Sequence, residues 1–100
     1  MILEVANLQV KASQTYEFEQ SFRQASQIIS SMKGYISHEL QRCLEVDNLY
    51  LLLVRWETLA DHTEGFRGST EYQEWKKLLH HYYDPFPAVH YYEIVESSQS

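Results

Sequence analysis

Aromatic and imidazole side chains gather in the second half of the 100-residue chain, where both tryptophans and four of the five histidines lie between positions 56 and 92. An imidazole exchanges a proton near neutral pH, and a buried tyrosine or tryptophan needs a hydrogen-bond partner for its polar tip. Helical spacing puts a set of candidate site residues on one face: His62, Phe66, Tyr72, Trp75, His81 and Tyr82. The alternative is that these side chains only pack on a sheet.

Asn7 is a candidate from the first part of the chain. It places an amide on a strand face that also carries Leu3 and Val5, and we expect this face to meet a layer of helices. A buried carboxamide must find hydrogen bonds from the backbone, from water or from a ligand. Asn7 is therefore either a structural amide or a ligand-binding group.

Other kinds of site lack their motifs. The sequence has no His-x3-His pair and no Cys-x2-Cys, so we predict no metal site. Cys43 has no identifiable base beside it for nucleophilic catalysis. The motif GFRGS has too few glycines for a dinucleotide-binding loop, and we expect Gly65 and Gly68 to break a helix instead.

Composition limits the partners and the compartment. A net charge of −6 without a Lys/Arg cluster disfavours nucleic acid and anionic membrane surfaces. A single cysteine, no signal-peptide pattern and no apolar run of membrane length predict a cytoplasmic protein. Hydrophobic residues make up 44% of the chain and aromatic residues 14%. A small monomer hides that much apolar surface with difficulty, so we expect a homodimer.

Hydrophobic periodicity predicts the elements of the first half. Alternation over residues 1–10 predicts a strand that is apolar on both faces. Apolar residues at helical spacing from Phe18 to Met32 predict a helix that ends at Gly34. Alternation over 35–45 and the apolar run over 49–56 predict a hairpin.

Capping residues and prolines mark the elements of the second half. Thr58 and Asp61 form an approximate capping box, and Ser69 can cap a further helix that Pro85 ends. Residues 88–96 predict the last strand. The chain is then a single α+β domain over residues 1–96, followed by a polar tail over 97–100.

The element order and several motifs resemble the antibiotic biosynthesis monooxygenase (ABM) domain. The matching motifs are WETLADH from Trp56 to His62, Ser69-x-x-Tyr72 and HYYEI from His90. More narrowly, GFRGS and YDPFP are similar to a group of uncharacterised members. The resemblance implies a ferredoxin-like βαββαβ subunit that pairs as a dimeric α+β barrel, with a cleft between the sheet and its own helices.

The resemblance also implies a chemistry. Some members oxidise phenols or quinols with O2 and use no metal, flavin or other cofactor, which requires a dry aromatic pocket and a base. By this resemblance His62 is the candidate base and Asn7 orients the substrate. We expect both to line one cleft together with the binding residues Phe66, Arg67, Tyr72, Trp75 and His81. The leading hypothesis is a cofactor-independent monooxygenase acting on an aromatic or quinol-like small molecule.

Two alternatives stay open. One is a non-enzymatic dimer that binds a small ligand or is purely structural. The other is a branch of the same family that degrades haem with an Asn on the first strand and a Trp and a His on the second helix. Asn7 matches this branch, but Phe66 and Lys76 stand about where its Trp and His would stand. His80 or His81 replaces the missing ligand only if the helix is shifted.

Overall fold

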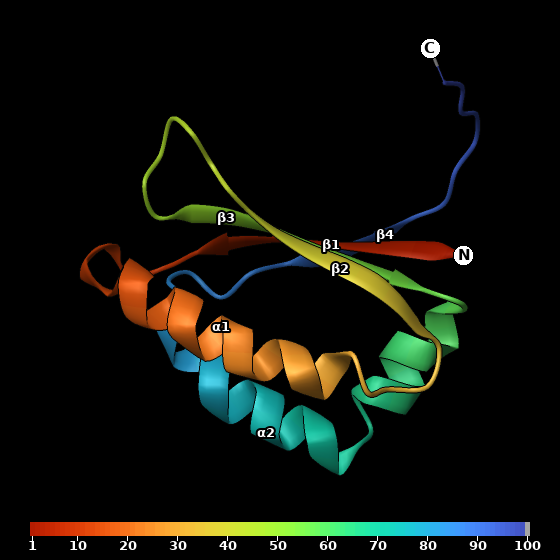
Figure 1. The fold of residues 1–100 in the computed structure, drawn as a ribbon, viewed down its shortest axis with the longest axis horizontal. Coiled ribbons are helices and arrows are strands. Elements are labelled where there is room, and N and C mark those ends of the chain that lie inside the picture. The colour runs from red at the N-terminus through yellow and green to blue at the C-terminus, as the bar shows by residue number, and fades with distance from the viewer. Residues whose placement is uncertain (100) are drawn as a thin grey trace.

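A four-stranded antiparallel sheet, covered on one face by two helices, forms the body of the molecule (Figure 1). The computed structural model describes residues 1–99, so Ser100 of the predicted tail lies outside the described residues. The strands, in the sheet order β2-β3-β1-β4, are β1 (Ile2–Gln9), β2 (Tyr35–Arg42), β3 (Leu49–Trp56) and β4 (Val89–Tyr92). The helices are α1 (Thr15–Ile29) and α2 (Thr70–Leu79), with short helices η1 (Ala12–Gln14), η2 (Asp61–Phe66) and η3 (His80–Tyr82). The predicted ferredoxin-like α+β fold is confirmed.

Strand β1 lies at the centre of the sheet and pairs along its whole length with β3. The predicted hairpin of β2 and β3 is confirmed. The last strand was predicted too long, because β4 pairs only with residues 3–6 of β1. Beyond Tyr92 the chain has no strand to pair with, and it runs away from the body (Figure 1).

Helix α1 buries the apolar stripe that its spacing predicts. The buried residues are Phe18, Phe22, Ala25 and Ile29. The turn after the helix contains Gly34 at a φ of 83°, a conformation that glycine adopts at no steric cost. A Cβ at this position would overlap the Asp61 carboxylate, so a side chain is excluded there by space as well.

The segment between β3 and α2 is held by local side-chain hydrogen bonds. Thr58 N–H donates to Asp61 Oδ2 at 3.2 Å and Asp61 N–H donates to Thr58 Oγ1 at 3.1 Å, which confirms the predicted capping box. Helix η2 then winds with π-type geometry, in which the Arg67 amide donates to the His62 carbonyl at 3.0 Å. Ser69 Oγ accepts from the Tyr72 amide at 3.1 Å, so the predicted cap of α2 is also confirmed.

The two faces of the sheet differ in cover. The helix-facing side is buried and carries Ala6, Leu8, Val10, Tyr50, Leu52, Val54 and Trp56. No helix covers the opposite side in Figure 1, and this outer face carries Leu3, Val5, Leu49, Leu51 and Leu53, all partly exposed. No helix within the described residues 1–99 is long and apolar enough to cross a membrane.

Candidate functional site

A buried carboxylate and a buried imidazole lie side by side under the helices. Glu4 is 5% exposed and His62 is 3% exposed, and they are the buried polar residues of the described chain. Glu4 Oε1 accepts a hydrogen bond from Trp56 Nε1–H at 2.9 Å and lies 3.4 Å from His62 Nε2. The other ring nitrogen of His62, Nδ1, lies 2.6 Å from the Tyr91 hydroxyl oxygen. These contacts form a continuous polar chain from β1 through η2 to β4.

Each residue of this polar network is positioned by the helix or strand that carries it. The alternation of β1 turns Glu4 to the same side as Ala6 and Leu8, beneath the helices. Trp56 is the last residue of β3 and pairs across the sheet with Ile2. The π-type turn of η2 buries His62 and Phe66 together, and their rings lie near the Trp56 ring with centroids 5.4 and 5.9 Å from it.

Burial shifts the pKa values of the two groups in opposite directions. Burial raises the pKa of Glu4 above 4.5, against the Trp56 hydrogen bond and the positive charge of Arg67, which both lower it. Burial, aided by the charge of Arg67, lowers the pKa of His62 to about 4. His62 is therefore a neutral imidazole at neutral pH, and the Glu4 carboxyl holds its proton more readily than an exposed glutamate does.

The proton positions on His62 depend on the groups that its two ring nitrogens face. When Glu4 is ionised its carboxylate only accepts hydrogen bonds, and the proton of His62 is then favoured on Nε2, the nitrogen that faces Glu4. Nδ1 then accepts from the Tyr91 hydroxyl. Burial raises the pKa of Tyr91, which keeps this hydroxyl protonated. Tyr91, His62 and Glu4 therefore form one line of polar groups, in which the 3.4 Å approach of His62 Nε2 to Glu4 is the longest step.

A cleft between the sheet and α2 borders the Glu4–His62 pair. Its unfilled volume is about 60 Å³. Its aromatic wall includes Phe66, whose ring centroid lies 5.2 Å from that of Tyr72 and 5.6 Å from that of Trp75. Arg67, His80, Tyr83 and Phe86 also line the cleft, and the exposed side chains of Arg67 and Phe86 mark its mouth. Phe86 is 65% exposed, so the segment after η3 contributes a side chain that is only loosely packed.

Most of the predicted site residues meet at this cleft. His62, Phe66, Arg67, Tyr72 and Trp75 all line it. His81 is exposed and does not line the cleft, whereas its neighbour His80 lines it. Since the chain turns by about 100° per residue in a helix, adjacent side chains point in different directions.

The predicted convergence of Asn7 with His62 is wrong. Asn7 is exposed on the outer face of the sheet, where it borders a shallow hollow with Gln41 and Leu51. Both faces of β1 carry apolar residues, so alternation separated the faces correctly but did not show which of them meets the helices. The face with Glu4, Ala6 and Leu8 is the buried one.

Two residues of the site were not singled out by the sequence, and a third was considered only as a haem ligand. Glu4 lies on the same face of β1 as Ala6 and Leu8. A carboxylate on this otherwise apolar face was the signal that could have identified it. Tyr91 was visible only as part of a strand motif. The sequence did not show which of the adjacent residues His80 and His81 faces the cleft. Burial, followed by the charges of Lys76 and Arg67, lowers the pKa of His80.

The same geometry bears on metals and on haem. Among residues 1–99, no group of three or more His, Cys, Asp or Glu side chains is arranged to hold a metal ion. The cleft has an unfilled volume of about 60 Å³, below the roughly 150 Å³ that accepts a benzene molecule, so it would have to widen far more for a haem group than for a single aromatic ring.

Comparisons with known proteins agree with this fold. Residues 1–78 match the family model described as antibiotic biosynthesis monooxygenase. The chain is 60% identical over 95 residues to "Uncharacterized protein YczJ" of Bacillus subtilis (strain 168), a match that covers 95% of this chain and 100% of that protein.

Solved structures give the same picture. The crystal structure of a "Putative antibiotic biosynthesis monooxygenase" from Bordetella bronchiseptica is similar with a TM-score of 0.90 and 33% identity, over 95% of this chain and 97% of that one. SnoaB, a cofactor-independent oxygenase from Streptomyces nogalater, shares the fold with a TM-score of 0.84 at 16% identity, over 96% and 94% of the two chains. On the family model and on these similarities, the chain belongs to the antibiotic biosynthesis monooxygenase family.

Proposed function

We propose that the protein is a cofactor-independent monooxygenase that oxidises an aromatic or quinol-like small molecule with O2. The observation that carries this proposal is the buried Glu4–His62 pair at the wall of an aromatic cleft, with the Tyr91 hydroxyl at the other ring nitrogen of His62. Family membership supports the class of reaction, and so does the fold shared with a cofactor-independent oxygenase. A lone thiol at Cys43 suits the reducing cytoplasm, which is the compartment we propose.

The proposed reaction balances without a further reductant. A hydroquinol and O2 give a hydroxyquinone and water: the substrate loses four electrons, one oxygen atom enters a ring C–H bond and the other leaves as water. The step that the protein must assist is removal of the phenolic proton, because the phenolate donates electrons to O2 more readily than the phenol. A buried base with a raised pKa is suited to this step.

Glu4 is the proposed base. Both of its contacts use Oε1, so we propose that Oε2 accepts the substrate proton. His62 orients the carboxylate and connects it to Tyr91, which is a change from the role of base expected from the sequence. Arg67 lies at the mouth of the cleft and offers a positive charge to the phenolate. Phe66, Tyr72 and Trp75 hold the ring.

The size of the cleft sets a condition on the proposal. An unfilled volume of about 60 Å³ is too small for a phenol, so the cleft must widen when the substrate enters. The segment with Phe86 and Pro87 borders the mouth and lies outside any helix or strand, which makes it the part proposed to move. The same volume favours the second candidate, a non-enzymatic dimer in which these aromatic residues are core.

Pairing with a second copy is part of the proposal. The outer face of the sheet carries five partly exposed leucine and valine side chains and no helix. We propose that this face meets the same face of another chain, because pairing removes the apolar surface from water. Asn7 lies on this face, so its amide is placed to bond across the interface.

Oxygen consumption tests the proposed activity. Wild-type protein is mixed with a panel of hydroquinols and polyphenols and compared with Glu4→Gln and His62→Gln. Loss of a general base lowers the rate by roughly 100-fold or more, so we expect that effect for Glu4→Gln and a smaller one for His62→Gln. The matched control is Glu74→Gln, the same change on the exposed face of α2.

Two results would argue against the monooxygenase. Wild-type rates equal to the uncatalysed background for every substrate would favour the ligand-binding or structural dimer. A rate that survives Glu4→Gln would show that another group takes the proton.

A further inference from the structure

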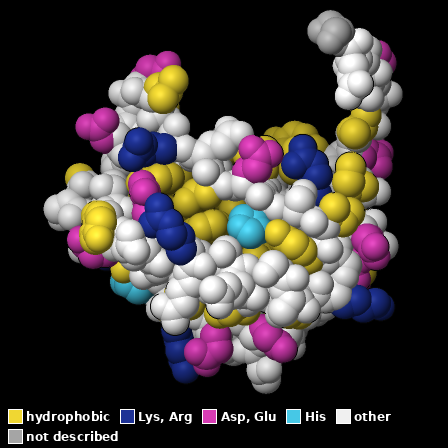
Figure 2. Space-filling view, viewed as in Figure 1, with side chains coloured by type: hydrophobic (Ala, Val, Ile, Leu, Met, Phe, Trp, Pro, Cys, Tyr) yellow, Lys and Arg dark blue, Asp and Glu magenta, His cyan; other side chains and the backbone are white. Residues whose placement is uncertain are grey.

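A second and larger hollow lies between α1 and the edge strand β2. Its unfilled volume is about 420 Å³, within the range of about 300 to 1,000 Å³ that is typical of small-molecule sites. Figure 2 shows it as an apolar floor between the sheet and the helix, with basic side chains at one end and a histidine at the other. None of its lining residues lines the cleft beside His62, so the two sites are separate.

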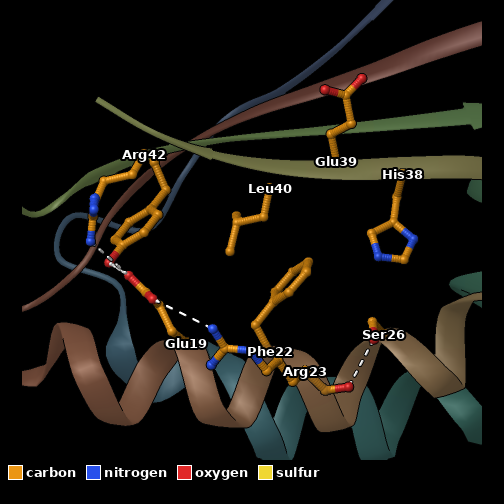
Figure 3. Close-up of a pocket in the computed structure, with 9 residues that line it drawn as sticks. Glu19, Phe22, Arg23, Ser26, His38, Glu39, Leu40 and Arg42 are labelled. Carbon is orange, nitrogen blue, oxygen red and sulfur yellow. Dashed lines mark hydrogen bonds and ion pairs between the residues drawn. The ribbon is translucent and has the colours of Figure 1, made fainter. Parts of the chain in front are cut away.

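The floor of this groove is apolar and the boundary to the cleft is aromatic. Phe22 points from α1 toward the sheet and Leu40 points from β2 toward the helix (Figure 3). The Phe22 ring centroid lies 5.9 Å from that of Trp75, which lines the cleft, so this ring pair forms the partition. His38 closes one end, and burial lowers its pKa, so it adds no positive charge at neutral pH.

The other end of the groove is positively charged. Arg23 and Arg42 both border it, and the carboxylate between them belongs to Glu19. Glu19 lies 3.6 Å from Arg42 Nη1 and 4.0 Å from Arg23 Nη2, which are loose contacts. The Tyr50 hydroxyl donates to Glu19 Oε2 at 2.6 Å and fixes the carboxylate in place.

Two guanidinium groups and one carboxylate leave one positive charge in excess. Glu39 also lines the groove, but its carboxylate points away from the arginines in Figure 3 and lies 3.8 Å from Arg55 Nη1, whose charge offsets it. The whole chain has a net charge of −6, so this positive site is opposite in sign to the molecule as a whole. Both arginine side chains are 65% exposed and keep donors free for a further anion.

We propose that this groove binds a small amphipathic carboxylate, whose apolar body lies on Phe22 and Leu40 and whose carboxylate meets Arg23 and Arg42. The apolar floor excludes a fully polar anion, and the paired guanidinium groups select the acid over a neutral molecule of the same shape. The bound acid shares the arginines with Glu19. Removal of the Glu19 charge therefore strengthens binding, whereas removal of either arginine charge weakens it.

Titration of the full-length protein with octanoate tests the site, with 1-octanol as the neutral molecule of equal length. Amide chemical shifts report where each compound binds. Because both arginines are exposed, we expect Arg23→Gln and Arg42→Gln each to weaken octanoate binding by about threefold, and the double variant by about tenfold. Glu19→Gln should tighten it by about threefold.

The exposed ion pair of Lys77 and Glu74 on α2 supplies matched controls. Lys77→Gln and Glu74→Gln make the same charge changes away from the groove, and both should leave octanoate affinity unchanged. Three outcomes would overturn the proposal: no octanoate binding to the wild type, equal affinity for octanol, or shifts centred on Tyr72 and Trp75 instead of Phe22 and Leu40. The readout is binding alone, so its failure is distinct from a failure of the proposed oxidation.

Discussion

A carboxylate buried beneath two helices is costly unless other groups compensate for the lost water. Glu4 receives the indole N–H of Trp56 and faces the imidazole of His62, and no buried side-chain nitrogen or oxygen in residues 1–99 lacks a partner. A leucine at position 4 would fill the same core with no such requirement. The polar chain is therefore a costly feature that stability alone does not explain, which is the physical reason for assigning it the chemistry.

Acid should destabilise the protein through His62. Its pKa is about 4 in the folded chain and about 6.5 when unfolded, so the unfolded chain binds more protons between these values. The free energy of unfolding should fall by about 3 kcal/mol from this group as the pH drops from 7 to below 4. Urea unfolding at pH 7 and pH 4 measures the fall, which should be smaller in His62→Gln.

Glu4 acts in the opposite sense on the same measurement. Its pKa is raised in the folded chain, so its contribution to stability is present below the ordinary carboxyl pKa and is lost as the pH rises through the raised value. Glu4 is present in both proteins, so the comparison of wild type with His62→Gln isolates the imidazole. Equal losses of stability in the two proteins would contradict the assignment.

Single residues were predictable where helical spacing fixed their direction. His62, Phe66, Tyr72 and Trp75 were placed together because helical spacing puts them on one face. Glu4 was not identified as a site residue, since a strand apolar on both sides gives no sign of which side is covered. Which face of β1 the helices cover is determined by the packing of elements that are distant in the sequence.

At the scale of elements, the two caps between β3 and α2 were predictable, whereas the start of α1, which has no side-chain cap, and the strand ends were not. A cap is a hydrogen bond within four residues, so Ser69 and the Thr58–Asp61 pair could be recognised directly. The end of β4 depends on how far β1 extends beside it, which is a contact between opposite ends of the chain. The π-type winding of η2 had no sequence signal that we recognised.

Loss of the Ser69 hydroxyl should destabilise the start of α2. Ser69 Oγ accepts from the Tyr72 amide, and its hydroxyl donates to the Phe66 carbonyl at 2.6 Å, so it joins η2 to α2. Ser69→Ala should lower the free energy of unfolding by about 1 kcal/mol. Ser69→Asp keeps the acceptor and should lose less. Equal urea midpoints for all three proteins would show that the cap is not needed.

Alanine should have opposite effects at two glycines. At Gly34 the φ of 83° and the Asp61 side chain both exclude a Cβ, so Gly34→Ala should cost roughly 2 kcal/mol or more. At Gly65 a Cβ would meet only the Ala60 carbonyl oxygen at 3.7 Å, an ordinary contact. Gly65→Ala should therefore be neutral or stabilise by up to about 1 kcal/mol. Thermal unfolding of the two variants should show shifts of opposite sign, or a shift at position 34 only.

At the scale of the whole molecule, one layer of helices covers one face of a sheet whose two central strands, β1 and β3, carry apolar residues on both faces. The alternation of β3 puts Tyr50 and Leu52 under the helices and leaves Leu51 and Leu53 on the outer face. Beyond β4 the chain carries Ile94 and Val95 away from the body, 68% and 97% exposed. Both features leave apolar surface in water that contact with another protein surface would remove.

The proposed dimer should dissociate when a charge enters the outer face. Leu53 lies on this face opposite Val5 of β1, so Leu53→Glu would bury an unpaired carboxylate in the interface. We expect the dissociation constant to rise by at least about 100-fold, with the far-ultraviolet circular dichroism of the folded chain retained. Sedimentation equilibrium at micromolar concentration measures the change.

The matched control makes the same substitution on a leucine away from that face. Leu59 is 46% exposed and lies just before η2, outside the sheet. Leu59→Glu should leave the dimer intact, because its side chain is not part of the outer face. If the wild type sediments only as a monomer, or if both variants dissociate alike, the apolar outer face is not the surface that joins two copies. In that case the exposed leucines and valines of β1 and β3 would have to be covered by a different partner or to remain in water.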